Sequence, residues 1–132
     1  RHQRHLCLLM IDVDGFKSFN DNKGHPEGDH LLRLIAQHLS KGIRNIDLVF
    51  RYGGDEFSVL LPDTPVNGAY DVAERLRVGF SNLGLGVTLS IGVAGLSPMI
   101  STKESLVEAA DRALYTAKNQ GRKQSIIAPH SN

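Results

Sequence analysis

Hydrophobic and polar positions along the chain predict a series of strands and helices. The continuous aliphatic run Leu6 to Ile11 is followed directly by an acidic residue, which predicts a strand buried on both faces and ending at Asp12. Two further apolar runs, Asp47 to Tyr52 and Phe57 to Leu61, are joined by Gly53-Gly54-Asp55. Paired glycines between apolar runs favour a tight turn, so these runs predict a β-hairpin with acidic residues at its tip.

Three helices are predicted from apolar residues that recur with a helical period. The first extends over Leu31 to Ile43. The second begins at Thr64-Pro65, a capping residue before a proline, and continues to Phe80. The third begins at a capping box over Ser101 to Glu104 and ends at Gly121.

Two more strands complete the predicted order. The β-branched residues from Val87 to Val93 predict one strand, in which Gly92 marks a bulge or a close approach, and Gln124 to Ile127 predicts a short last strand. Together the elements predict an α/β fold in which helices cover a mixed sheet built around the hairpin. This order lets the first strand lie beside the hairpin, so we expect Asp12 and Asp55 to meet at one edge of the sheet.

The composition is typical of one soluble globular domain. The chain has 132 residues, of which 41% are hydrophobic and 22% charged, enough to bury one core. Fifteen Lys and Arg against 14 Asp and Glu give a net charge of +1. Because no basic stripe accompanies the 6% of aromatic residues, the sequence predicts no nucleic-acid partner. Any phosphate binding is therefore expected to be local.

The ends of the chain and its single cysteine add little chemistry. Arg1 to His5 is polar and is interpreted as the leading end of a longer chain, with His2 and His5 in solvent rather than on a metal. We interpret residues 6–128 as a single domain and residues 129–132 as a tail. Cys7 lies in an apolar run, which favours a core position and a reducing compartment. No apolar run is long enough to span a bilayer, so we expect no membrane contact by this domain.

Two acidic segments are candidates for phosphate and metal chemistry. In Asp12 to Lys17 a carboxylate ends a buried strand, and a glycine-containing turn with a lysine can cradle phosphates around a hard cation. Gly53 to Glu56 offers two adjacent acids, of which strand alternation aims only one inward. Taken singly, each segment is also compatible with an ordinary polar turn. Together, Asp12 and Asp55 supply the carboxylates that metal-dependent phosphoryl transfer requires.

The seven residues at the predicted hairpin, Arg51-Tyr52-Gly53-Gly54-Asp55-Glu56-Phe57, resemble the signature of the GGDEF family of diguanylate cyclases. Other segments resemble this family's first strand, nucleotide loop and later blocks: Asp12 to Lys17, Phe19-Asn20-Asp21, Gly24-His25, Gly28-Asp29, Ser90 to Ala94, Ala110 to Tyr115, Ala117-Lys118 and Gly121-Arg122. Several ordered motifs at matching separations make the resemblance specific, and it covers nearly the whole chain.

The resemblance implies a palm-like, ferredoxin-related α+β fold with the motif on a β-hairpin. It implies an enzyme that condenses two GTP into cyclic di-GMP and two pyrophosphates, with Mg²⁺ as cofactor, Mn²⁺ as a substitute and a homodimer for catalysis. It also implies a cytoplasmic domain under an N-terminal sensory or regulatory domain, in a full-length protein with or without a membrane anchor. The family's first helix, which follows an Asp-x-Leu-Thr segment, has no counterpart before Leu6 and is expected to be missing here.

The family's metal ligands and catalytic residues match five positions of this sequence. Asp12, the Val13 carbonyl and Asp55 match the metal ligands. Asp55 also matches the base for the attacking 3′-hydroxyl, with Glu56 assisting it. Lys17 matches the lysine that neutralises phosphate charge in the transition state, a task suited to a compact ammonium group.

The resemblance also implies residues that bind the nucleotide. Lys118 and Arg122, one helical turn apart, match further triphosphate contacts. Asn20 and Asp29 match the pair that recognises guanine. A carboxylate accepts from guanine N1–H and the exocyclic amine, whereas adenine offers no such donor pair, so GTP is favoured over ATP. His25 matches a nucleotide-site histidine, and a turn histidine bonded to the backbone remains the alternative.

A second site is implied beside the hairpin. Arg44-Asn45-Ile46-Asp47 matches the Arg-x-x-Asp segment of the family's inhibitory product site, and Arg75 matches a secondary arginine there. By itself such a pair is usually an ordinary surface ion pair. Its offset from Gly53 favours binding of cyclic di-GMP, because the planar fork of an arginine binds guanine edges and phosphates.

Two classes of function remain open from the sequence. One is a diguanylate cyclase with product inhibition, and the other is a non-catalytic module that binds GTP or cyclic di-GMP as a sensor. The intact set Asp12, Lys17, Asp55 and Glu56 favours the enzyme, since loss of an acid or of the lysine would remove metal binding or charge stabilisation. A pure dimerisation scaffold would leave this polar set unexplained.

Overall fold

A five-stranded mixed sheet with the order β2-β3-β1-β4-β5 forms the centre of the fold. The computed structural model describes residues 4–132, so residues 1–3, with His2 among them, lie outside the described residues. The strands are β1 (Leu6–Asp14), β2 (Leu48–Gly53), β3 (Glu56–Pro62), β4 (Thr88–Gly95) and β5 (Ser125–Ile127). The helices are α1 (Phe16–Lys23), α2 (His25–Lys41), α3 (Val66–Ser81) and α4 (Lys103–Asn119). The predicted α+β class, with the hairpin in a mixed sheet, is confirmed.

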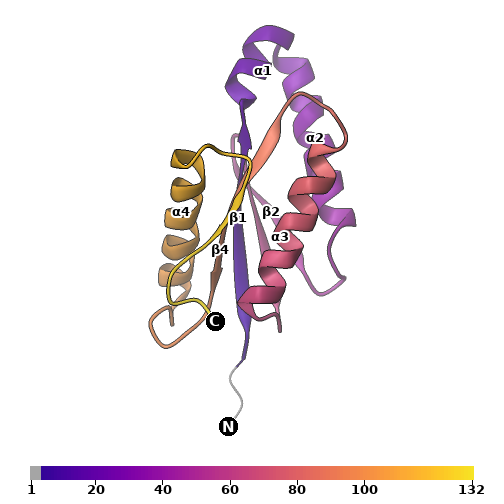
Figure 1. Cartoon of the computed structure of the whole chain (residues 1–132). Helices are drawn as coiled ribbons and strands as arrows, with labels where there is room; N and C mark the ends of the chain where they lie inside the picture. Colours follow the sequence, from indigo (N-terminus) through magenta and orange to yellow (C-terminus); the bar gives the residue numbers. More distant parts are fainter. Residues whose placement is uncertain (1–3) are drawn as a thin grey trace.

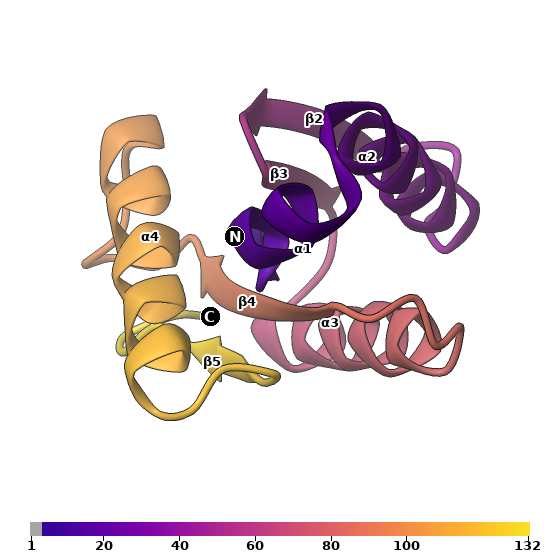
Figure 2. The same ribbon diagram turned by 90° about the horizontal axis from the view of Figure 1, so that it is seen from above.

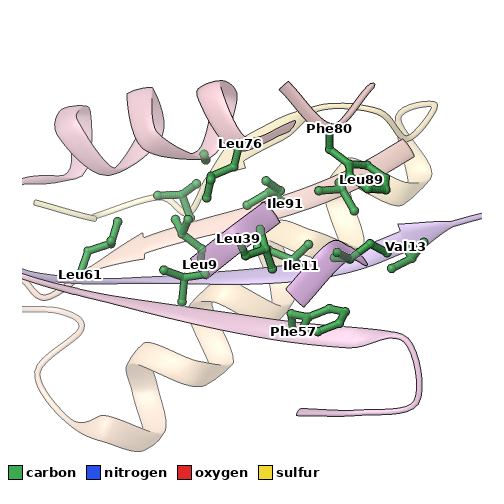
Figure 3. Packing of buried hydrophobic residues seen from close by; sticks show 14 of the residues in the cluster. Leu9, Ile11, Val13, Leu39, Phe57, Leu61, Leu76, Phe80, Leu89 and Ile91 are labelled. Atoms are coloured by element: carbon green, nitrogen blue, oxygen red, sulfur yellow. The ribbon is translucent and has the colours of Figure 1, made fainter. Parts of the chain in front are cut away.

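The long helices lie in two layers, one on each face of the sheet. Seen from above, α4 covers one face, and α2 and α3 lie against the other (Figure 2). Side chains of β1 alternate between these layers. Leu8 and Met10 pack in the cluster with α4. The larger cluster, on the α2 and α3 side, takes the alternate residues of β1, and Figure 3 shows Leu9, Ile11 and Val13 there.

The central strand β1 is antiparallel to both of its neighbours, β3 and β4. The register pairs Asp12 with Glu56 on one side and with Ser90 on the other, which confirms that the first strand lies beside the hairpin. The predicted end of this strand at Asp12 is wrong. Pairing with β4 continues as far as Asp14 opposite Thr88, so Asp12 and Asp14 both lie on the α4 face of the sheet.

Two consecutive helices replace the loop that the sequence predicted after β1. The turn is reduced to Gly15, whose φ of 75° lies in the left-handed region, and α1 begins directly after it (Figure 1). A second left-handed glycine, Gly24, separates α1 from α2. The second helix begins at His25 rather than at Leu31, because its first turn is mostly polar and exposed and shows no apolar period.

Two predicted helix caps are also wrong in detail. In α4 the capping box joins Thr102 to Ser105, with Thr102 Oγ1 accepting from the Ser105 backbone N–H at 3.0 Å, one residue later than predicted. Ser101 and Thr102 are both capping residue types, so the pattern did not separate them. In α3 the N-cap position is Pro65, and the Thr64 hydroxyl donates instead to the Pro62 carbonyl at 2.8 Å.

The close approach predicted as one alternative for Gly92 is confirmed. A Cβ atom at this position would overlap the Ala110 carbonyl oxygen and the Leu114 backbone nitrogen of α4. The absence of a side chain therefore lets α4 lie directly on β4. Lys118 follows Leu114 by one helical turn, so this contact places the end of α4 at the end of the sheet where β1 finishes.

The predicted burial of the cysteine is confirmed. Cys7 is fully buried and its thiol donates to the Thr64 carbonyl oxygen at 3.0 Å. Burial raises the pKa of this thiol to about 11. It is therefore a neutral core group at physiological pH. Within residues 4–132, none of the helices combines the length and the apolar character needed to cross a membrane.

Candidate active site

A pocket of about 520 Å³ lies at the end of β1. Its walls come from β1, α1, the hairpin tip and the end of α4: Asp12, Val13, Asp14, Gly15, Phe16, Lys17, Ser18, Asp21, Asp55, Lys118 and Arg122. The predicted metal ligands and all three predicted phosphate-binding cations are among them. Segments far apart in sequence meet here because β1 pairs with β3 and α4 packs on β1 and β4.

Three acidic residues crowd one side of the pocket region. Asp12 is buried, and Asp55 and Glu56 are half-buried beside it. The Val13 backbone N–H donates to the Asp55 carbonyl oxygen at 3.3 Å and holds the hairpin tip against the strand. Burial and the Asp12 charge raise the pKa of Asp55, and burial, Asp12 and Asp111 raise the pKa of Glu56. Such crowding is typical of a site that binds a cation or transfers a proton.

Lys118 brings a positive charge to these acids. Its Nζ lies 2.5 Å from Asp12 Oδ2, and this hydrogen bond raises the pKa of Lys118. The other carboxylate oxygen, Asp12 Oδ1, is buried and has no hydrogen-bond partner among the described residues. A buried carboxylate oxygen without a partner is costly, so this atom is available to a ligand.

The donor atoms at this end of the pocket fit Mg²⁺. Among residues 4–132, no group of three or more His, Cys, Asp or Glu side chains is placed to hold a metal ion. Mg²⁺, however, is usually bound through one or two carboxylates, with substrate phosphates and water completing its shell. The free oxygen of Asp12, the Asp55 carboxylate and the adjacent Val13 carbonyl meet that requirement.

The start of α1, which also lines the pocket, suits a phosphate group. Gly15 precedes the first turn of α1, which contains no acidic residue and has no side-chain cap. The N–H groups at such a helix start attract anions. Lys17 lies in this first turn and is exposed. Arg122 reaches the pocket from beyond the end of α4, so the expectation that it shares a helical turn with Lys118 is wrong, because the helix ends at Asn119.

The predicted guanine-binding residues lie at the junction of α1 and α2. The Asn20 side-chain Nδ2 donates to His25 Nδ1 at 2.9 Å, so His25 contacts a side chain and not the backbone. Asp29 is exposed one helical turn after His25. Within residues 4–132, Asn20 Oδ1 is buried and has no hydrogen-bond partner. The roles of these residues in guanine binding stay predictions.

Sequence reasoning missed two residues that shape this site. A Cβ at Gly28 would overlap Asn20 Oδ1, so Gly28 fixes how closely α1 and α2 approach. The available signal was its place in the Gly28-Asp29 segment of the family resemblance, since the predicted helix began only at Leu31. Asp14 was treated only as part of a turn, yet it is buried and hydrogen-bonded, and its spacing of two residues from Asp12 was the available signal.

The residues of the predicted product site lie together at the start of β2, the end of the strand away from the hairpin tip. The Arg44 guanidinium binds Asp47 in bidentate fashion at 2.7 and 3.0 Å, and it also donates to the Pro62 carbonyl. Although burial opposes it, the contact with Arg44 lowers the pKa of Asp47. Arg75 donates to the Gly42 carbonyl close by. The structure brings the three residues together, and their binding of cyclic di-GMP stays a prediction.

The sequence matches the family model described as diguanylate cyclase, GGDEF domain, over residues 1–124. The chain therefore belongs to the GGDEF domain family of diguanylate cyclases. It is 39% identical over 134 residues to the probable diguanylate cyclase DgcC of Escherichia coli K12, a match that covers 97% of this chain and 36% of that protein. The response regulator PleD of Caulobacter vibrioides is 43% identical over 126 residues, covering 89% and 28% respectively. The chain spans about a third of the length of these curated relatives.

Solved GGDEF structures share the fold. The active GGEEF domain of a diguanylate cyclase from Vibrio cholerae superposes with a TM-score of 0.90 at 32% identity, covering 97% of this chain and 85% of that one. The GGDEF domain of DgcB from Caulobacter crescentus, solved in complex with c-di-GMP, gives a TM-score of 0.87 at 30% identity, covering 94% and 78%. The predicted family and fold are thus confirmed.

Proposed function

We propose that this chain is the catalytic domain of a diguanylate cyclase, which condenses two GTP into cyclic di-GMP and two pyrophosphates. The observation that carries the proposal is the pocket that Asp12 and Asp55 line together with three cations, Lys17, Lys118 and Arg122. Carboxylates and cations side by side in one pocket complement a triphosphate bound with a divalent ion. Membership of the GGDEF family supports the same reaction.

Asp12, the Val13 carbonyl and Asp55 are the residues that would hold Mg²⁺, or Mn²⁺ in its place. A bound ion would neutralise phosphate charge and make the 3′-hydroxyl more acidic. Asp55 accepts the hydroxyl proton. Glu56 assists from the adjacent position.

The cations bind the triphosphate and stabilise the charge that develops during transfer. Lys17 acts from the start of α1, while Lys118 and Arg122 act from the end of α4 and the turn after it. Asn20 and Asp29 bind the guanine edge, and His25 orients the Asn20 amide through their hydrogen bond. This set of acceptors and donors selects GTP over ATP.

Catalysis needs a second copy of the domain. Cyclic di-GMP contains two equivalent 3′ to 5′ linkages, so each GTP presents its 3′-hydroxyl to the α-phosphate of the other. One set of Asp12, Lys17 and Asp55 holds one triphosphate, and a two-fold axis between two such sets allows both attacks. An N-terminal sensory or regulatory domain in the cytoplasmic full-length protein would control this contact by raising the effective concentration of the pair.

Product inhibition is assigned to Arg44, Asp47 and Arg75. Two guanidinium groups beside a carboxylate can bind guanine edges and phosphates of cyclic di-GMP. Binding there requires Arg44 to share its present contacts with Asp47 and Pro62. The GGDEF domain of DgcB, which shares this fold, has been crystallised with c-di-GMP. This supports the proposal that the present domain also binds cyclic di-GMP.

The decisive experiment is incubation with GTP and Mg²⁺, followed by chromatographic separation of the nucleotides. The chain is assayed by itself over a range of concentrations and as a fusion to a dimeric coiled coil, with EDTA as the control. We expect cyclic di-GMP from the fusion, and specific activity that rises with concentration for the unfused chain. GTP that is bound by the fusion but left unchanged would overturn the enzyme and identify a sensor module.

A further inference from the structure

We propose that Asp14 is a positioning residue that holds the turn between α4 and β5 and, through it, Arg122 at the mouth of the pocket. Any effect of Asp14 on GTP binding rests on the proposed cyclase function, in which Arg122 binds the triphosphate. The effect on the turn is independent of that function. Asp14 is two residues from Asp12 on the same face of β1, and the two carboxylates do different work.

The Asp14 carboxylate is buried and fully hydrogen-bonded. It is 8% exposed. Its Oδ1 accepts from the Ser90 hydroxyl at 2.7 Å, and its Oδ2 accepts from the Thr88 hydroxyl at 2.7 Å and from the Lys123 backbone N–H at 3.1 Å. The same N–H is shared with Ser90 Oγ at 3.1 Å. Because both oxygens have partners, Asp14 is a structural anchor rather than a cation ligand.

The turn that Asp14 binds has an unfavourable backbone. Gly121, Arg122 and Lys123 have φ angles of 109°, 64° and 53°. Only the first of these residues is a glycine, and residues with a Cβ atom rarely adopt the left-handed region. Such a conformation persists when surrounding contacts enforce it. The hydrogen bond from Lys123 N–H to Asp14 joins the turn to β1 across 109 positions of the sequence and supplies such a contact.

The position of Arg122 follows from this anchoring. Arg122 Nε lies 3.9 Å from Asp14 Oδ1, and the side chain is 57% exposed. Both residues line the same pocket. Asp14 therefore attracts the Nε side of the Arg122 guanidinium, and most of the N–H donors of Arg122 stay free to bind an anion. Without that support we expect the turn to sample other conformations and Arg122 to leave the pocket mouth.

The first test concerns the turn alone and uses the chain without nucleotide. In Asp14→Asn we expect hydrogen exchange at the Lys123 amide to become at least about tenfold faster and tryptic cleavage after Arg122 and Lys123 to accelerate. The acceleration at Lys123 should exceed any acceleration in α2, which reports the general loss of stability. Ser90→Ala, which removes one donor to Asp14 and one acceptor of Lys123 N–H, should show a smaller effect in the same direction and serves if Asp14→Asn does not fold. Unchanged exchange at Lys123 in both variants would overturn the proposal.

The second test joins the turn to the substrate. In the dimeric fusion, Asp14→Asn and Arg122→Ala should each raise KM for GTP with a smaller effect on kcat. The double variant should resemble Arg122→Ala, because Asp14 acts through that residue. Additive effects on KM would contradict the coupling. A wild-type fusion that makes no product would refute the proposed cyclase activity instead. The exchange measurement would still test whether Asp14 holds the turn.

Discussion

Asp12 and Asp14 lie two residues apart on one face of one strand, yet their surroundings differ. Asp14 accepts hydrogen bonds on both oxygens from Ser90, Thr88 and the Lys123 backbone. Asp12 has Lys118 on one oxygen and no partner among the described residues on the other. Buried polar groups normally have hydrogen-bond partners. The Asp14 carboxylate therefore stabilises the fold, and the Asp12 carboxylate is left for a ligand.

The difference extends to the neighbours of each residue. Around Asp14 the partners are hydroxyls and a backbone N–H, which stabilise a carboxylate. Around Asp12, two further acids have a raised pKa because they are crowded and partly desolvated. A bound cation would relieve that repulsion. The acidic cluster around Asp12 is thus the less stable of the two environments. Removing a charge from it should have the opposite effect on stability to removing the charge of Asp14.

The largest expected effect is the loss of activity in Asp55→Asn. A neutral amide is a poor Mg²⁺ ligand and cannot accept the hydroxyl proton, so we expect the rate of cyclic di-GMP formation by the dimeric fusion to fall about a thousandfold. The circular dichroism spectrum should not change. Asp71→Asn, an exposed change on α3, is the matched control. Near-normal turnover in Asp55→Asn would refute the role assigned to this residue.

The second prediction concerns the helix that delivers Lys118 to Asp12. Gly92→Ala places a methyl group against the backbone of α4, so we expect a loss of about 3 kcal/mol in the free energy of unfolding. Gly68→Ala on α3 is the control, because its Cβ meets only side-chain atoms at ordinary contact distances, Thr64 at 3.4 Å and Pro65 at 3.9 Å. That change should stabilise the chain by up to about 1 kcal/mol. Urea unfolding measures both, and equal effects would contradict the close packing of α4.

The third prediction compares how the charges of Asp55 and Asp14 affect the stability of the folded chain, measured by thermal unfolding in EDTA. A raised pKa favours folding below the ordinary aspartate value, about 3.9, and this contribution is lost as the pH rises through the raised value. At pH 7, Asp55→Asn should therefore raise Tm, and the gain should vanish near pH 3. Asp14→Asn should lower stability at pH 7 by about 2 kcal/mol, since it removes charged hydrogen bonds. A fall in Tm for Asp55→Asn at pH 7 would contradict the contrast.

The smallest expected effect lies at the other end of β2. Arg44→Ala should weaken the binding of cyclic di-GMP in calorimetry and raise severalfold the product that accumulates late in the reaction, because the guanidinium fork is lost. Arg33→Ala, an exposed change on α2, is the control. An unchanged affinity for cyclic di-GMP in Arg44→Ala would reject the assigned product site.

The sequence predicted the central strand, the hairpin and the meeting of Asp12 with Asp55, because long aliphatic runs and paired glycines are strong local signals. It did not predict α1. No residue of that helix is buried, and its two apolar residues, Phe16 and Phe19, are too few to define a helical period. The different fates of Asp12 and Asp14 depend on Ser90 and Lys123, which only the tertiary fold brings close.

The most direct test of the central claim is the effect of Mg²⁺ on binding of a non-hydrolysable GTP analogue, measured by calorimetry. If the free oxygen of Asp12 serves a cation, Mg²⁺ should tighten binding at least about tenfold in the wild type. The same enhancement should persist in Asp14→Asn, even where overall affinity is lower, and disappear in Asp12→Asn. An equal enhancement in Asp12→Asn, or its loss in Asp14→Asn alone, would contradict the account.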